Sequence, residues 1–130
     1  MSTYKIVICG GDAVGKTNLV YAWHGLNHPK TYSPTQGFQL STWTSPQGNT
    51  YKLWDIGGRY MGMTNYLTRT NAFLFVYDSD IPNSIDQAHK WETTARRLCG
   101  NVTGIYIDTR DIRLGTKSIQ DIQSILASQL

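Results

Sequence analysis

Residues 10–17 read Gly10-Gly11-Asp12-Ala13-Val14-Gly15-Lys16-Thr17, a complete GxxxxGK[ST] loop, and they directly follow the apolar run of residues 4–9. In such a loop the glycines let backbone N–H groups point at a polyphosphate, Lys16 neutralises its oxygens and the Thr17 hydroxyl ligates Mg²⁺. The helix that follows adds the positive end of its dipole. The stretch therefore predicts a strand, a phosphate-binding loop and a helix in succession. The residues predicted to contact the ligand here are Gly11, Asp12, Ala13, Val14, Gly15, Lys16, Thr17 and Asn18.

The composition is typical of one domain that spans residues 1–130, with 40% hydrophobic residues. The 12 basic and 9 acidic residues leave only a mild positive charge, and the pattern indicates no nucleic-acid partner. The two cysteines have no metal-binding or disulfide spacing, which favours a reducing compartment. No apolar run approaches the roughly 20 residues that cross a bilayer, and no signal peptide or lipidation motif is visible. We therefore expect a cytoplasmic domain with no membrane anchor of its own.

Strand and helix patterns alternate along the chain. Besides residues 4–9, strand-like runs cover residues 38–44, 50–56, 72–77 and 104–107, and helical patterns cover residues 15–24, 83–99 and the segment after Ser118. The turn-like residues 45–48 predict an antiparallel hairpin, and the fully apolar run 72–77 predicts a central parallel strand. Ser118 and Asp121 have the spacing of a capping box. The pattern predicts a doubly wound, three-layer α/β fold of about five mostly parallel strands, with ligands at their carboxyl ends.

Further stretches carry a family resemblance. They read Tyr32-Ser33-Pro34-Thr35-Gln36-Gly37-Phe38, Trp54-Asp55-Ile56-Gly57-Gly58, and Tyr66-Leu67-Thr68-Arg69-Thr70-Asn71 leading to Tyr77-Asp78-Ser79. Together with the phosphate-binding loop they resemble the Ras superfamily of small GTPases, and most of all its Arf and Arf-like branch. The resemblance is specific over residues 6–79. It implies the small-GTPase version of the P-loop fold and a site for Mg²⁺ with GTP or GDP.

The same resemblance implies roles for two switch segments. Thr35 would ligate Mg²⁺ and hydrogen-bond the γ-phosphate, Asp55 would hold the ion through water, and the Gly58 amide would sense the γ-phosphate. The expected metal ligands are thus Thr17, Thr35 and Asp55. Because the γ-phosphate contacts exist only in the triphosphate state, their loss shifts the population to a relaxed form.

The resemblance also implies a partner surface of three exposed aromatic side chains at Phe38, Trp54 and Tyr66. Strand periodicity places Trp54 on the face of Lys52 and opposite Leu53, which supports partial exposure of the indole. The alternative interpretation is that all three are core residues, because aromatic side chains are usually buried. An exposed cluster beside a switch would bind effector or regulator proteins.

The catalytic position departs from the family pattern. The residue after Gly58 is normally a glutamine that orients the attacking water, and here it is Arg59. A guanidinium has donors but no acceptor, so it cannot take a hydrogen bond from that water. Slow or lost GTP hydrolysis is therefore expected, with Lys16 clamping the phosphates. In an alternative role, Arg59 would stabilise the γ-phosphate charge in cis.

The guanine-reading motif departs as well, because Asp108-Thr109-Arg110-Asp111 stands where the family has Asn-Lys-x-Asp. Asp111 keeps the carboxylate that would accept from guanine, Asp108 can only accept, and Thr109 lacks the long stem that would cover the ring. Weakened base binding that still favours guanine is expected at these three residues. In the alternative reading Asp108 and Asp111 are turn and cap residues.

The chain after Asp111 is too short for the helix, sixth strand, second base-contacting loop and final helix of the family. We therefore expect a fold truncated after the guanine-motif strand, with a terminal helix that covers an apolar flank of the sheet. Self-association through this shortened region is a further hypothesis. The sequence favours a slow or non-hydrolysing GTP/GDP switch, and the alternative function is a pseudo-GTPase module that engages the partners of Arf-like GTPases without cycling.

Overall fold

The computed structural model describes residues 2–25, 37–57 and 64–130, and its described strands form one twisted sheet. The strands are β1 (Thr3–Gly10), β2 (Phe38–Thr44), β3 (Thr50–Ile56), β4 (Ala72–Tyr77) and β5 (Thr103–Asp108). Their order is β2-β3-β1-β4-β5. The β2–β3 hairpin is antiparallel and all other pairs are parallel. The expected mostly parallel α/β sheet is therefore confirmed.

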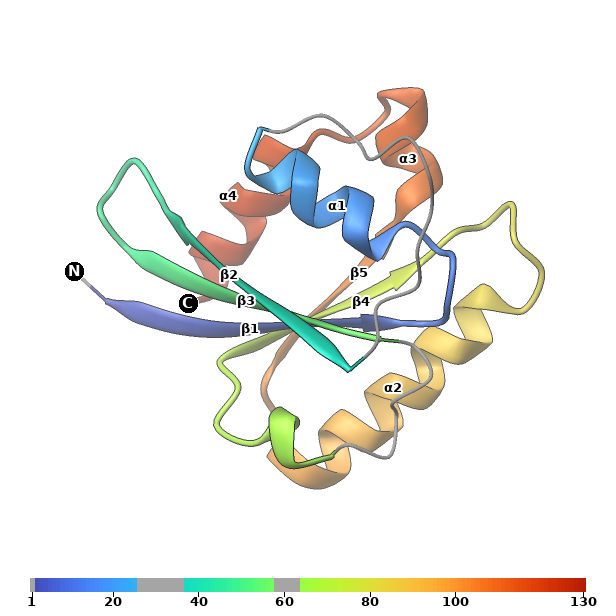
Figure 1. Ribbon diagram of the computed structural model, residues 1–130, viewed down its shortest axis with the longest axis horizontal. Helices are drawn as coiled ribbons and strands as arrows, with labels where there is room; N and C mark the ends of the chain where they lie inside the picture. The colour runs from blue at the N-terminus through green and yellow to red at the C-terminus, as the bar shows by residue number, and fades with distance from the viewer. Residues whose placement is uncertain (1, 26–36, 58–63) are drawn as a thin grey trace.

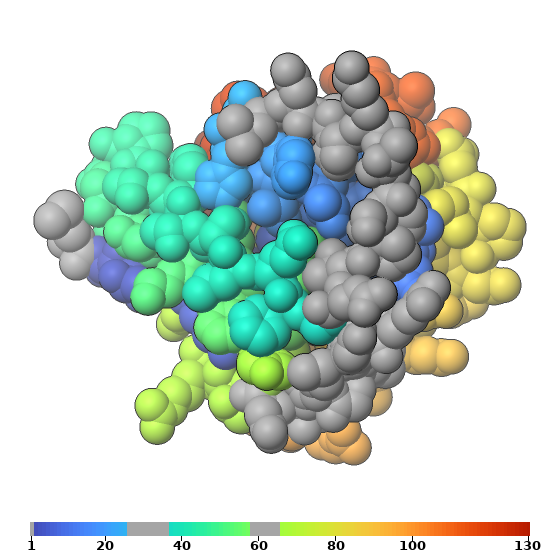
Figure 2. Space-filling view, viewed as in Figure 1, coloured from blue at the N-terminus to red at the C-terminus, as the bar shows by residue number. Residues whose placement is uncertain are grey.

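Helices cover both faces of the sheet (Figure 1). α1 (Lys16–Trp23) and α4 (Ile119–Gln129) lie on one face, and α2 (Ser84–Cys99) and the short 3-10 helix η2 (Thr64–Leu67) lie on the other. The central strands β1 and β4 are buried on both sides, which explains their unbroken apolar sequences. In the surface view the β2–β3 hairpin projects from one side of the molecule (Figure 2).

The terminal helix α4 takes the place that the sequence assigns to a flank-covering helix. Its buried side chains Ile122 and Leu126 join the core beneath α1, and the Gln123 side-chain amide donates to the carbonyl oxygen of Trp23 at 3.4 Å. The expected capping box is present, with Ser118 and Asp121 each accepting from the backbone N–H of the other. The prediction of a terminal helix on an apolar face is confirmed.

One helix was not expected. α3 (Thr109–Leu114) begins directly after β5, inside the segment that the sequence assigns to a base-reading loop. The Asp108 side chain caps its first turn by accepting from the Arg110 backbone N–H, and Gly115 ends the helix with φ 75°. The end of β5 is therefore a strand-to-helix turn, and this turn positions the residues of the candidate base site.

Within the described parts of the chain, no helix combines the length and apolar character needed to cross a bilayer.

Candidate functional site

The carboxyl ends of four strands meet at one edge of the sheet. β1 leads into the phosphate-binding loop, β3 carries Asp55 near its end, β4 is followed by Asp78, and β5 ends at Asp108. In an open α/β sheet this edge is where ligands bind. Polar groups that are far apart in the sequence are thereby gathered around the loop of residues 10–17.

The backbone of the phosphate-binding loop requires its glycines. A Cβ on Gly10 would lie 2.2 Å from the carbonyl oxygen of Val76, closer than any real contact, so only glycine fits against β4. Gly15 and Ala13 have φ of 93° and 61°. Gly15 is the N-cap of α1, so the first N–H groups of that helix face the loop. The loop has the geometry of an anion-binding cradle.

Lys16 lies inside the loop with only 6% of its surface exposed. Its Nζ donates to the carbonyl oxygens of Gly11 at 2.6 Å and Gly10 at 3.3 Å. Burial lowers the pKa of this ammonium, while the nearby carboxylates of Asp55 and Asp12 act in the opposite direction. A desolvated cation of this kind is strongly stabilised by an anion that reaches the loop.

The Thr17 hydroxyl donates to Oδ2 of Asp55 at 3.3 Å. A hydroxyl and a carboxylate oxygen are ligands that Mg²⁺ prefers, and they lie at the end of β3 next to the phosphate-binding loop. The two residues therefore fit a Mg²⁺ site bound between protein and phosphate. The third expected ligand, Thr35, lies outside the described residues, as do Gly58 and Arg59.

A cavity of about 270 Å³ lies between α1 and α3, next to the phosphate-binding loop. Its lining residues are Gly15, Asn18, Leu19, Thr109, Ile112 and Arg113. Three of them, Leu19, Ile112 and Arg113, were not among the residues predicted to contact a ligand. The cavity touches both the phosphate-binding loop and the segment that replaces the guanine motif, but of the three predicted base-site residues only Thr109 lines it, and a base site there stays a prediction.

Thr109 links this cavity to the phosphate-binding loop. Its buried hydroxyl donates to the carbonyl oxygen of Val14 at 2.7 Å, and the carbonyl oxygen of Tyr77 lies 3.2 Å away. The Thr109 methyl group would lie 3.3 Å from a Cβ placed on Gly15, which shows how closely the start of α3 approaches the loop. A small hydroxyl side chain thus joins three segments of the site at this position.

The two aspartates of the motif have structural partners. Oδ1 of Asp108 accepts from the backbone N–H groups of Ser79 and Arg110, both at 3.0 Å. Oδ1 of Asp111 accepts from the Thr116 hydroxyl at 3.1 Å, and Asp111 is not among the residues that line the cavity. Asp108 acts as a helix cap, as in one of the two readings of the sequence. The base-binding role of both residues stays a prediction.

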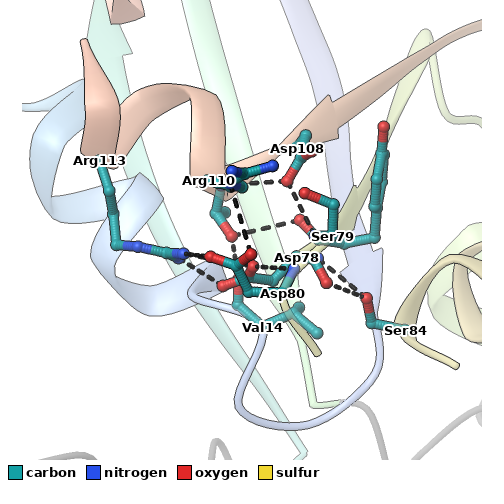
Figure 3. Close-up of polar contacts among 10 residues, drawn as sticks. Val14, Asp78, Ser79, Asp80, Ser84, Asp108, Arg110 and Arg113 are labelled. Carbon is teal, nitrogen blue, oxygen red and sulfur yellow. Dashed lines mark hydrogen bonds and ion pairs between the residues drawn. The ribbon is translucent and has the colours of Figure 1, made fainter. Parts of the chain in front are cut away.

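An ion-pair network joins α3 to the segment after β4 (Figure 3). Both terminal nitrogens of Arg113 contact the carboxylate of Asp78, and Nη2 also lies 3.0 Å from Asp80. Arg110 pairs with Asp80 at 3.4 Å. The side chain of Asp78 is 7% exposed, and the hydrogen bond from Arg113 holds the pKa of its carboxyl below the ordinary value. Ser84 adds a bond to the Asp78 backbone carbonyl.

The three aromatic residues form one cluster, although they come from β2, β3 and η2. The ring centroid of Phe38 lies 5.0 Å from that of Trp54 and 4.5 Å from that of Tyr66. All three are half-buried: they pack against the core on one side and are exposed on the other. Leu40, which pairs with Trp54 across the hairpin, is 50% exposed and extends the apolar surface. Leu40 was missed because single exposed leucines carry no signal in a sequence.

Lys5 on β1 fixes this cluster from the side. Its Nζ donates to the carbonyl oxygens of Tyr66 at 2.6 Å and Thr68 at 2.9 Å, and it lies 4.5 Å from the ring centroid of Trp54. These bonds satisfy carbonyl groups at the end of η2. The aromatic surface is therefore held by a cation on the neighbouring strand, a contact that no local sequence pattern predicts.

Comparison with known proteins decides the family. The family model described as Roc, the Ras of Complex domain of DAPkinase, matches residues 5–111. ADP-ribosylation factor-like protein 3 from Chlamydomonas reinhardtii is 36% identical over 129 residues, which cover 94% of this chain and 71% of that protein. The chain belongs to the Ras superfamily of small GTPases. Ras-related protein Rab-7L1 from Rattus norvegicus and from Mus musculus is 27% identical over 96 residues, which cover 68% of this chain and 47% of each Rab protein.

Membership of the Ras superfamily confirms the family and fold predicted from the sequence. Guanine-nucleotide binding is the common property of small GTPases, and such proteins usually interact with effectors and regulators. The loop, Lys16, and the Thr17–Asp55 pair are the parts of this Ras-like domain whose geometry is suited to a nucleotide's phosphates.

Proposed function

We propose that this Ras-like domain is a Mg²⁺-dependent switch that binds GTP and GDP and hydrolyses GTP slowly or not at all. The observation that carries the proposal is the arrangement of Lys16 in the phosphate-binding loop, with the Thr17–Asp55 pair beside it. Bound Mg²⁺ would neutralise phosphate charge between Thr17 and Asp55, with Thr35 as the third proposed ligand. Residues 11–18 would hold the phosphates through backbone N–H groups.

Slow hydrolysis follows from Arg59. A guanidinium at the water-positioning place cannot accept a hydrogen bond from the attacking water, so the water loses its orienting partner. Gly58 would still contact the γ-phosphate through its backbone. In the competing role, Arg59 would stabilise developing charge in cis and sustain turnover.

Guanine specificity in this proposal is weak. Asp111 would provide the acceptor for the base, but its carboxylate already accepts from Thr116. Asp108 caps α3, and the Thr109 hydroxyl donates to the carbonyl oxygen of Val14. The base would therefore be held with fewer specific contacts than the Asn-Lys-x-Asp motif offers, and the phosphates would supply most of the affinity.

The partner surface in this proposal is the aromatic cluster of Phe38, Trp54 and Tyr66. Its half-buried rings and the exposed Leu40 form an apolar patch of the kind that binds other proteins. Effectors or regulators would bind there when the switch segments are ordered. The two free cysteines are consistent with a cytoplasmic location for this domain.

The second candidate function is a pseudo-GTPase module that occupies such partners without cycling. It is favoured by the structural partners of Asp108 and Asp111, which leave both carboxylates engaged without a base. Exposed apolar side chains at Leu114, Ile125 and Leu130 are also compatible with self-association in the C-terminal region.

The deciding experiment denatures freshly purified protein, identifies any released nucleotide by chromatography, and follows added GTP for inorganic phosphate over hours with and without EDTA. We expect GTP or GDP in the extract, loss of binding in EDTA and in Lys16→Ala, and slow phosphate release that Arg59→Gln accelerates. Faster release from wild type than from Arg59→Gln would support the role of Arg59 in cis.

The outcome also separates the two functions. Bound GTP without phosphate release, together with partner binding that Lys16→Ala abolishes, supports a locked switch. Partner binding that survives Lys16→Ala supports the pseudo-GTPase module. A wild-type protein that binds neither GDP nor ADP would refute the proposed nucleotide switch.

A further inference from the structure

The cavity between α1 and α3 lacks a long side chain at the position where the family places a lysine stem. Thr109 is short and its hydroxyl is directed to the phosphate-binding loop. A flat base in this cavity would therefore have one face without cover from Thr109. Another residue that lines the cavity must cover that face if the base is to be shielded from water.

Arg113 is the residue placed to do so. It lies four residues after Thr109 on α3, so both side chains lie on the same face of the helix, and both line the cavity. Its side chain is 51% exposed, so part of it is accessible to a ligand. In Figure 3 it extends from α3 toward Asp78 and Asp80.

The guanidinium is held by its edge. Nη1 contacts Oδ2 of Asp78, and Nη2 lies 3.3 Å from Oδ1 of Asp78 and 3.0 Å from Oδ2 of Asp80. These contacts use in-plane N–H groups in a two-pronged arrangement, which fixes the plane of the group. The edge that would read a base by hydrogen bonding is thus largely occupied, whereas the flat face is not used by these bonds.

We infer that Arg113 covers the nucleotide base by stacking its guanidinium plane on the ring, with Asp78 and Asp80 as positioning residues. This rests on the proposed nucleotide-binding function. Planar guanidinium groups stack on aromatic rings, whereas a lysine ammonium has no such plane. Asp78 is well suited to its role because its nearly buried carboxylate can accept both prongs of the group.

Stacking has a consequence for specificity. Every base has a π face, so a stacking contact adds affinity with little discrimination between guanine and adenine. The contact also concerns only the base, because the phosphates lie at the loop of residues 10–17. Loss of Arg113 should therefore lower the affinity for nucleotides and leave unchanged the affinity for ligands that consist of phosphates alone.

The test measures binding of GDP, ADP and inorganic pyrophosphate, each with Mg²⁺, to nucleotide-free protein by isothermal titration calorimetry. We expect Arg113→Ala to lower the affinity for GDP and for ADP by about ten-fold each, the usual scale of one stacked base, and to leave the affinity for pyrophosphate unchanged. Arg113→Lys should weaken their binding by a smaller but measurable factor, because the lysine stem still covers part of the ring while the guanidinium plane is lost. Asp78→Asn should weaken both nucleotides by a smaller factor.

Arg110→Ala is the matched control. Arg110 lies on the same helix, carries the same charge and pairs with Asp80, but it does not line the cavity. We expect this variant to bind all three ligands like wild type. Pyrophosphate binding also reports that each variant has a folded phosphate-binding loop.

Three results would overturn the inference while the proposed function stands: unchanged GDP affinity in Arg113→Ala, full affinity in Arg113→Lys, or an equal loss in Arg110→Ala. An equal loss of pyrophosphate affinity would likewise assign Arg113 to general electrostatics. If wild-type protein binds pyrophosphate but neither nucleotide, or binds none of the three ligands, the proposed function itself fails.

Discussion

Replacing Thr109 by valine tests whether the first residue of α3 holds the phosphate-binding loop in place. The substitution keeps the shape of the side chain and removes the hydroxyl that donates to Val14 at 2.7 Å. Val14 and Thr109 are both buried, so the carbonyl oxygen loses its donor where water has little access. An unsatisfied buried acceptor costs about 1–3 kcal/mol, and the added methyl group returns up to about 0.8 kcal/mol. The expected net loss is about 0.2–2.2 kcal/mol when the full return is subtracted.

Thermal unfolding measures this loss, which corresponds to a decrease in Tm of about 4 °C per kcal/mol for a domain of this size. The same variant should release GDP several-fold faster, because Val14 belongs to the loop that binds the phosphates. Thr109→Ser is the control, since it keeps the hydroxyl and removes only a methyl group. The reasoning is refuted if Thr109→Val has the Tm and GDP release rate of wild type, or if Thr109→Ser has the lower Tm and the faster GDP release of the two variants.

Three more predictions concern other contacts of the fold. Asp78→Asn should lower the free energy of unfolding by about 1 kcal/mol at pH 7 and by progressively less as the pH falls below the ordinary carboxyl pKa of 3.8, measured by urea titration. The sign follows because Arg113 lowers the folded-state pKa of Asp78, so the stabilisation is present above the ordinary carboxyl pKa of 3.8 and is lost as pH falls through the lowered value. Lys5→Met should speed amide hydrogen exchange in residues 64–70, because the carbonyl groups that Lys5 binds lose their donor, and unchanged exchange would contradict this. Gly10→Ala should destabilise the domain by at least about 2 kcal/mol in urea unfolding, since a Cβ would meet a carbonyl oxygen of β4 at 2.2 Å, and wild-type stability would contradict the geometry.

Much of the fold could be predicted because its signals are local. The expected bounds of the strands at residues 38–44, 50–56 and 72–77 coincide with β2, β3 and β4. Each run is apolar or alternating and is bounded by turn residues, so periodicity and turn chemistry agree. The phosphate-binding loop was predictable for the same reason, since its glycines are required by backbone geometry at fixed spacing.

The helix α3 could not be predicted from periodicity. It has six residues, and its two apolar residues, Ile112 and Leu114, are two positions apart, so it gives no helical repeat to detect. Asp108 and Gly115 have the residue types of helix caps, but the same segment also resembles a base-reading motif, so the sequence alone does not indicate a helix there. Once α3 is recognised as a helix, the shared face of Thr109 and Arg113 follows from their spacing.

The long-range contacts of the site had no sequence signal at all. Arg113 and Asp78 are 35 residues apart, and nothing local indicates that the end of β4 lies against α3. The aromatic cluster is an intermediate case. Strand alternation predicted the outward face of Trp54, but only the fold brings Phe38 and Tyr66 to it from separate segments.

Two consecutive residues of β3 connect the proposed nucleotide site to the proposed partner surface. Trp54 and Asp55 are consecutive, so their side chains point to opposite faces of the sheet, one toward the aromatic cluster and the other toward Thr17. A ligand that changes the position of Asp55 therefore acts on the same strand that carries the partner surface, with no loop between them. A ligand can shift this equilibrium only by its difference in affinity for the two arrangements. By linkage, a partner that binds Trp54 in one arrangement must raise the affinity for the nucleotide by the same factor by which the nucleotide raises the affinity for the partner. In the proposed switch, nucleotide binding and partner binding would then both depend on the position of β3.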